Sequence, residues 1–68
     1  MYTNQRREKI LALLQERGSV SVNDLTELLS VSKATIRSDL NYLSDNNMLI
    51  RTHGGATRSK EDETLKID

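Results

Sequence analysis

The chain has 68 residues with ten basic and ten acidic side chains, so its formal net charge at pH 7 is zero. A chain of this length forms one domain at most. It has no cysteine, which excludes disulfides, thiolate metal sites and cysteine nucleophiles. No apolar run approaches the ~20 residues of a membrane span, so we expect a cytoplasmic protein with no membrane partner.

The charges are distributed unevenly along the chain. Residues 1–58 carry eight Lys or Arg and six Asp or Glu, whereas residues 59–68 carry two and four. The apolar content of 35% is almost wholly aliphatic, with two tyrosines and neither Trp nor Phe. These features favour a thin helical core with a little sheet. The weakly basic body is compatible with a nucleic-acid partner but does not require one.

The first predicted helix covers about residues 4–17, with Thr3 or Asn4 as its N-cap. Apolar residues at three- and four-residue spacing mark its inner side. They are Ile10, Leu13 and Leu14, with Leu11 beside them. Gly18 follows at the position where a helix commonly ends in a left-handed residue.

A very short strand and a second helix are predicted next. Residues 19–21 alternate in polarity like a strand. Ser21 also precedes a helical pattern at 22–29 and can cap it, with Asp24 three residues later as in a capping box. The helix is expected to give three residues to the core, namely Leu25, Leu28 and Leu29.

The third predicted helix, at about 33–46, is the element around which the chain is organised. Ser30 and Val31 interrupt the helical pattern, and Ser32 stands where an N-cap is needed. One buried stripe then recurs at four- and three-residue spacing, formed by Ile36, Leu40 and Leu43. Asn47 is expected to end the helix in a left-handed conformation. Two helices joined by so short a turn predict a helix-turn-helix.

A β-hairpin is predicted after the third helix. Residues 48–53 have the pattern of a strand, the Gly-Gly pair at 54–55 that of a tight turn, and 56–59 that of the returning strand. This register places Arg51 opposite Arg58 on one face of the hairpin. Two opposed arginines repel each other unless an anion lies beside them, so we expect the hairpin to hold a DNA phosphate.

The elements together predict a mainly helical fold with a small β-hairpin, that is, a winged helix-turn-helix of three helices plus a wing. We expect this domain to occupy residues 1–59. Residues 60–68 are acidic and contain two isolated apolar residues with no core to join. They are expected to be a disordered tail or the start of a linker to an absent effector domain.

The order of these elements and several short motifs resemble the DeoR-type bacterial transcription regulators. The motifs are Arg6-Arg7 with Ile10, Gly18-Ser19-Val20-Ser21-Val22, Thr35-Ile36-Arg37 followed by Asp39-Leu40, and Arg51-Thr52-His53-Gly54-Gly55-Ala56. Together they cover residues 6–56. The combination of the third-helix string with the His-Gly-Gly-Ala string is specific, whereas either half alone is weak.

The resemblance implies an N-terminal, sequence-specific DNA-binding domain, usually of a repressor of sugar or nucleoside catabolism. The third helix would enter the major groove and the wing would lie on the phosphate backbone of double-stranded DNA. In this family a larger C-terminal domain binds a phosphorylated sugar and drives oligomerisation, and 68 residues leave no room for it. We therefore expect a monomeric isolated domain, a homo-oligomeric full-length protein and no cofactor.

The residues expected to contact DNA lie at the start and on the outer face of the third helix and on the wing. They are Ser32, Lys33, Ala34, Thr35, Arg37, Ser38, Asn41, Arg51, His53, Gly54, Gly55 and Arg58. Further phosphate contacts are expected from Arg6, Arg7 and Tyr42. Arg37 is the most important of these residues, because it can bind guanine with two hydrogen bonds or reach a phosphate.

Several of these residues also have a purely structural interpretation. Ser32 can be a helix cap without contacting DNA. Arg6 and Arg7 can form a solvated face, and Tyr42 can cover the first helix. Asp39 would repel phosphate, so we interpret it as the partner of an arginine in the first helix.

Other classes of function have less support. A single histidine, no cysteine and no phosphate-binding loop argue against an enzyme. His53 has no partner at metal-ligand spacing, so no metal site is expected. The alternative is a winged-helix module for protein–protein contact, which would need an exposed apolar patch on the third helix or the wing.

Overall fold

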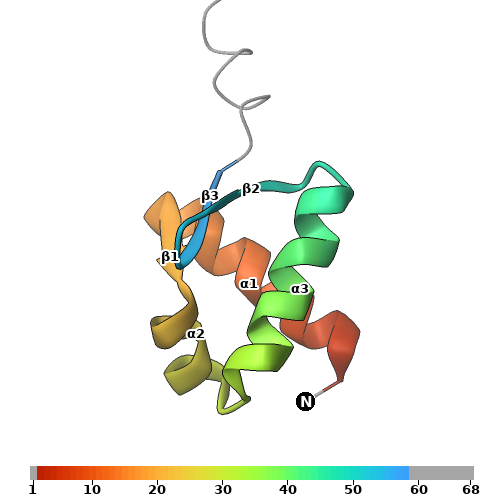
Figure 1. Cartoon of the computed structure of the whole chain (residues 1–68), viewed down its shortest axis with the longest axis vertical. Helices are drawn as coiled ribbons and strands as arrows, with labels where there is room; N and C mark the ends of the chain where they lie inside the picture. The colour runs from red at the N-terminus through yellow and green to blue at the C-terminus, as the bar shows by residue number, and fades with distance from the viewer. Residues whose placement is uncertain (1, 59–68) are drawn as a thin grey trace, which may run out of the picture.

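The computed structural model describes residues 2–58, which form three helices and a three-stranded antiparallel sheet (Figure 1). In chain order the elements are α1 (Thr3–Arg17), β1 (Ser19–Ser21), α2 (Val22–Leu29), α3 (Lys33–Asp45), β2 (Leu49–Thr52) and β3 (Gly55–Arg58). The predicted element order and the predicted winged helix-turn-helix fold are therefore confirmed. The tail expected at 60–68 lies outside the described residues, as does Ser59 at the predicted end of the hairpin.

The ends of α1 agree only in part with the sequence. Tyr2 is the N-cap and makes no side-chain cap bond. The predicted cap at Thr3 or Asn4 is wrong, because both residues already lie in the first helical turn. At the other end, Gly18 has φ +85° and its N–H donates to the Leu14 carbonyl at 2.7 Å. This agrees with the prediction that the helix ends in a left-handed glycine.

The core lies where the inner sides of the helices meet the sheet. Its members are Ile10, Leu14, Val22, Leu25, Leu29, Ile36, Leu40, Leu43, Leu49 and Ala56. Leu28 was expected there but is 52% exposed. The short α2 fills its inward side with Val22, Leu25 and Leu29, so Leu28 lies outside, near Arg17. Among the described residues, no helix combines the length and the apolar character that crossing a bilayer requires.

The hairpin register differs from the predicted one by two residues. Arg51 pairs with Ala56 and Arg58 pairs with Leu49, so the two arginines are not opposite each other. A shift of two keeps every side chain on its predicted face, and Arg51 shares the helix-facing side with the buried Leu49 and Ala56. The prediction that Arg51 and Arg58 lie opposite each other is therefore wrong, whereas the contact of the hairpin with a DNA phosphate stays a prediction.

The third strand explains this shift. β3 is the central strand of the order β1-β3-β2, and its pairing with β1 places Gly55 opposite Ser21. A Cβ on Gly55 would lie 2.1 Å from the Val20 carbonyl oxygen, so only glycine fits at that position. Gly55 is thus needed inside the sheet and leaves the turn to His53 and Gly54, where Gly54 has φ +83°.

The two glycines of the wing should respond differently to the same substitution. Gly55→Ala is expected to lower the free energy of unfolding by about 3 kcal/mol, because the added methyl group must separate β1 from β3. Gly54→Ala should cost about 1 kcal/mol, since its Cβ would meet no atom within 4 Å and only the left-handed backbone opposes it. Urea unfolding followed by circular dichroism measures both, and equal losses would contradict the observed register.

Candidate nucleic-acid interface

α3 presents one side to the core and the opposite side to solvent. Ile36, Leu40 and Leu43 are buried. The exposed side carries Ala34, Arg37, Ser38 and Asn41, which we call the α3 ridge. Small polar or methyl-bearing side chains with one arginine are suited to the edges of bases in a major groove. The ridge therefore has the composition of a DNA-reading surface.

The start of α3 is fixed by its cap. Ser32 Oγ accepts a hydrogen bond from the Thr35 N–H at 3.2 Å and donates to Thr35 Oγ1 at 3.0 Å. Ser30 has φ +56°, and this left-handed residue, which the sequence did not single out, closes the turn after α2. The predicted cap at Ser32 is confirmed, and its contact with DNA stays a prediction, as does that of Thr35.

A hollow that we call the basic groove lies between α3, the start of α2 and the turn of the wing. Its lining residues are Val22, Asn23, Lys33, Arg37, Arg51, His53 and Gly54. The Val22 N–H donates to the Gly54 carbonyl at 2.8 Å, which fixes the wing turn against α2. None of the described residues that line the groove carries a carboxylate, so the groove attracts anions such as phosphate. Asn23 was not among the predicted site residues, because its position depends on this docking of the wing.

Arg51 is oriented by two acceptors. Its Nε–H donates to Asn41 Oδ1 at 3.0 Å, and its Nη1 donates to the Gly55 carbonyl. The bond to Asn41 joins the wing to the α3 ridge. The sequence did not reveal this bond, although the alternation of the strand already placed Arg51 on the same face of the hairpin as Ala56.

Two predicted contact residues lie apart from the groove. Arg58 stands at the open end of the hairpin, where its N–H donates to the Gly18 carbonyl at 3.1 Å. A Cβ on Gly18 would lie 3.3 Å from Arg58 Nη2, so the guanidinium covers the C-terminal end of α1. Gly55 is buried beneath β1. The structure thus brings Lys33, Arg37, Arg51, His53 and Gly54 together and leaves Arg58 and Gly55 elsewhere.

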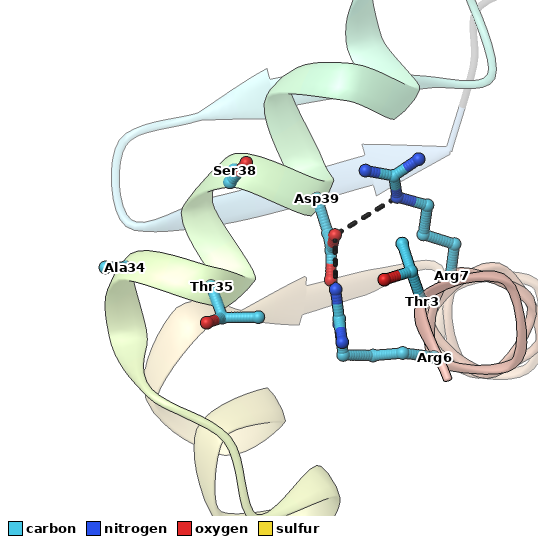
Figure 2. Close-up of a pocket in the computed structure, with 7 residues that line it drawn as sticks. All are labelled: Thr3, Arg6, Arg7, Ala34, Thr35, Ser38 and Asp39. Carbon is cyan, nitrogen blue, oxygen red and sulfur yellow. Dashed lines mark hydrogen bonds and ion pairs between the residues drawn. The ribbon is translucent and has the colours of Figure 1, made fainter. Parts of the chain in front are cut away.

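A partly buried ion cluster connects α1 to α3. Figure 2 shows Arg6 and Arg7 reaching from α1 to the carboxylate of Asp39, which is 1% exposed. Arg6 uses Nε and Nη2 to bind both carboxylate oxygens, and Arg7 Nε donates to Oδ1 at 3.1 Å. The interpretation of Asp39 as the partner of an arginine in the first helix is confirmed, with two arginines in place of one. We call these three residues the Asp39 cluster.

The pKa of Asp39 reflects opposing influences. Burial by itself would raise it, but the hydrogen bonds and positive charges of Arg6 and Arg7 outweigh burial and hold the pKa below its ordinary value. The hydrogen bond to Asp39 likewise raises the pKa of Arg6. Asp39 is therefore charged at neutral pH.

Tyr42 packs on α1 through Arg7. The Arg7 guanidinium lies 3.8 Å from the centroid of the Tyr42 ring, a cation–π distance. This contact supports the interpretation that Tyr42 covers the first helix.

The Asp39 cluster also borders a hollow lined by Thr3 and by the ridge residues Ala34 and Ser38, as Figure 2 shows. Phosphate contacts from Arg6, Arg7 and Tyr42 stay predictions.

A helix-turn-helix whose second helix is exposed beside a basic β-hairpin defines a winged helix-turn-helix DNA-binding domain. The chain belongs to the family of DeoR-like helix-turn-helix domains, whose model matches residues 6–62. The resemblance stated from the motifs is therefore confirmed.

Curated relatives of the chain are transcription regulators. It is 46% identical over 56 residues to the glycerol-3-phosphate regulon repressor of Escherichia coli strain K12, covering 82% of this chain and 22% of the relative. It is 39% identical over 71 aligned positions to the "Putative galactitol utilization operon repressor" of the same strain, covering 98% and 63%. The L-fucose operon activator of Haemophilus influenzae is 44% identical over 57 residues, covering 84% and 23%. No solved structure matches the chain.

The chain thus corresponds to only part of these regulators. It spans about a fifth of the length of two of them and less than two thirds of the third. What the comparisons show for this chain is the helix-turn-helix DNA-binding domain of a transcription regulator.

Asp39→Asn is expected to lower the free energy of unfolding by about 3 kcal/mol at pH 7, because it removes one partner of a buried ion cluster. The folded-state pKa of Asp39 lies below the ordinary 3.8. Its contribution is therefore complete at neutral pH and is lost as the pH falls through the folded-state pKa, because the unfolded chain takes up the proton first. Chemical unfolding at several pH values should show wild type and Asp39→Asn converging in acid.

Asp45→Asn is the matched control, since Asp45 is an exposed carboxylate at the end of the same helix. Its effect should stay within about 0.5 kcal/mol. A difference between wild type and Asp39→Asn that stayed constant from neutral to acid pH would show that the charge of Asp39 is not what stabilises the fold.

Proposed function

We propose that the chain binds double-stranded DNA sequence-specifically, with α3 in the major groove and the wing on the phosphate backbone. The observation that carries this proposal is the basic groove, in which Arg37 is exposed beside Lys33 and Arg51 with no carboxylate among the described lining residues. The α3 ridge lies next to this groove and offers hydrogen-bonding groups and a methyl group for base edges.

The names of the relatives support a role in regulating carbohydrate utilisation. Two of them are named as repressors, of glycerol-3-phosphate and galactitol genes, and one as an activator of an L-fucose operon. We propose that this chain is the DNA-binding part of a repressor of this kind and acts in the cytoplasm, not as an enzyme. The regulator as a whole would bind a phosphorylated-sugar effector through a further domain and form a homo-oligomer, with this domain alone monomeric.

A protein–protein module finds less support in the described residues. The large apolar side chains that they expose are Tyr2, Leu28, Tyr42 and Met48. None of these belongs to the basic groove or to the α3 ridge, and Tyr42 carries the Arg7 guanidinium. Tyr42 is the one of these that lies on α3, and a docking surface for another protein would need a larger continuous apolar area than this single ring.

Arg37→Ala is expected to weaken binding to a selected DNA site by about 1–3 kcal/mol, because one base or phosphate contact is lost. Fluorescence anisotropy with a labelled duplex, chosen from a random library by the wild-type chain, measures the change. Lys9→Ala is the control, since Lys9 is an exposed cation of α1 that lines neither the basic groove nor the hollow beside the wing. It should bind as the wild type does, and the proposal fails if Arg37→Ala also binds as tightly as the wild type.

The salt dependence of binding should report the phosphates that the chain neutralises. We expect about four to six phosphate contacts, so log K should fall with log salt at a slope of about −4 to −5. Lys33→Ala should make the slope of log K against log salt less steep by about one unit. The variant neutralises one phosphate fewer and therefore displaces one counterion fewer from the DNA. Titrations at several salt concentrations test this, and a flat salt dependence would argue against a DNA backbone as the partner.

A further inference from the structure

Asn41 joins the α3 ridge to the wing through its amide oxygen. Arg51 Nε–H donates to Asn41 Oδ1 at 3.0 Å while Arg51 Nη1 donates to the Gly55 carbonyl. A guanidinium can only donate hydrogen bonds, so the amide oxygen of Asn41, and not its nitrogen, must face Arg51. The NH₂ group of the exposed Asn41 is therefore directed away from Arg51, and its oxygen lies beside a positive charge.

We propose that Arg51 restricts Asn41 to donating hydrogen bonds, and that Asn41 therefore selects a G·C pair over an A·T pair at the position it faces. This inference rests on the proposed DNA-binding function. An unrestrained asparagine reads adenine with both groups, accepting from N6 and donating to N7. Arg51 takes one of the two lone pairs of the Asn41 oxygen, and its positive charge repels the adenine amino group from the other, so Asn41 is a poor acceptor for adenine N6. Guanine instead offers two acceptors, O6 and N7, to the free NH₂ group.

The bond from Arg51 is strong enough to persist beside a base. A hydrogen bond from a charged donor is about twice as strong as one between neutral groups, so the adenine amino group competes poorly for the Asn41 oxygen. The second bond, from Arg51 to the Gly55 carbonyl, holds the guanidinium in place from the other side. Because Gly55 is fixed inside the sheet by β1, this anchor does not move with Asn41.

Asn41 also lies within reach of base edges. An α-helix with its side chains is about 10–12 Å across, and the major groove is about 12 Å wide. α3 can therefore enter the groove with its ridge towards the bases. Ala34 and Asn41 are about two helical turns apart, so Asn41 lies on the same exposed side as Ala34, Arg37 and Ser38.

The test combines sites selected from random DNA with affinities for defined duplexes. Asn41→Ala first identifies the base pair that Asn41 reads, as the position whose preference disappears. At that pair the wild type should favour G·C over A·T by about tenfold. Arg51→Met should reverse the preference to A·T, because the released amide can again read adenine with both groups. Arg58→Met, which removes a wing arginine placed away from Asn41, should leave the preference unchanged.

Each other result overturns the inference. A wild-type preference for A·T at the Asn41-dependent pair would overturn the inference by itself. This measurement needs no variant of the wing, so it remains decisive even if Arg51→Met fails to fold. An unchanged preference in folded Arg51→Met, or no Asn41-dependent position at all, would overturn it while selected sites still supported DNA binding. If the wild type selected no sequence, the proposed function itself would fail, and this inference with it.

Discussion

The position of α3 depends on a carboxylate that has almost no contact with water. Asp39 is 1% exposed and sits between two guanidinium groups of α1, each of which would be costly to bury without it. Asp39 stands on the side of α3 opposite the wing, and the ion cluster acts together with the buried stripe of α3 to fix which side of the helix turns outwards. The exposure of Arg37 and Asn41 follows from that orientation, so contacts on the other sides of the helix decide which residues the α3 ridge contains.

The wing is fixed by an equally local constraint at its base. The Val20 carbonyl approaches β3 so closely that only Gly55 can occupy the facing position, and this sets the register of the hairpin. The register in turn brings Arg51 to Asn41 and the wing turn to Val22. A three-residue strand before α2 thus controls the geometry of the groove between α3 and the wing.

The sequence predicted the elements well because helix caps, apolar spacing and glycine signals are local. The bounds of α2 and the left-handed residues Gly18 and Asn47 agree with the prediction. The hairpin register was wrong because it depends on β1, which is more than thirty residues away in the chain. The candidate site could be proposed from the sequence as a set of residue types, but the bond between Arg51 and Asn41 required the arrangement of α3 and the wing in space.

The sheet order places the end of β3 at the C-terminal end of α1, where the backbone of Arg58 is hydrogen-bonded to Gly18 (Figure 1). The wing turn is at the other end of the same strand. β3 is therefore tied to a helix at each end, to the end of α1 through Arg58 and to the start of α2 through Gly54 in the turn before it, so the strand cannot shift along the sheet without breaking one of these bonds.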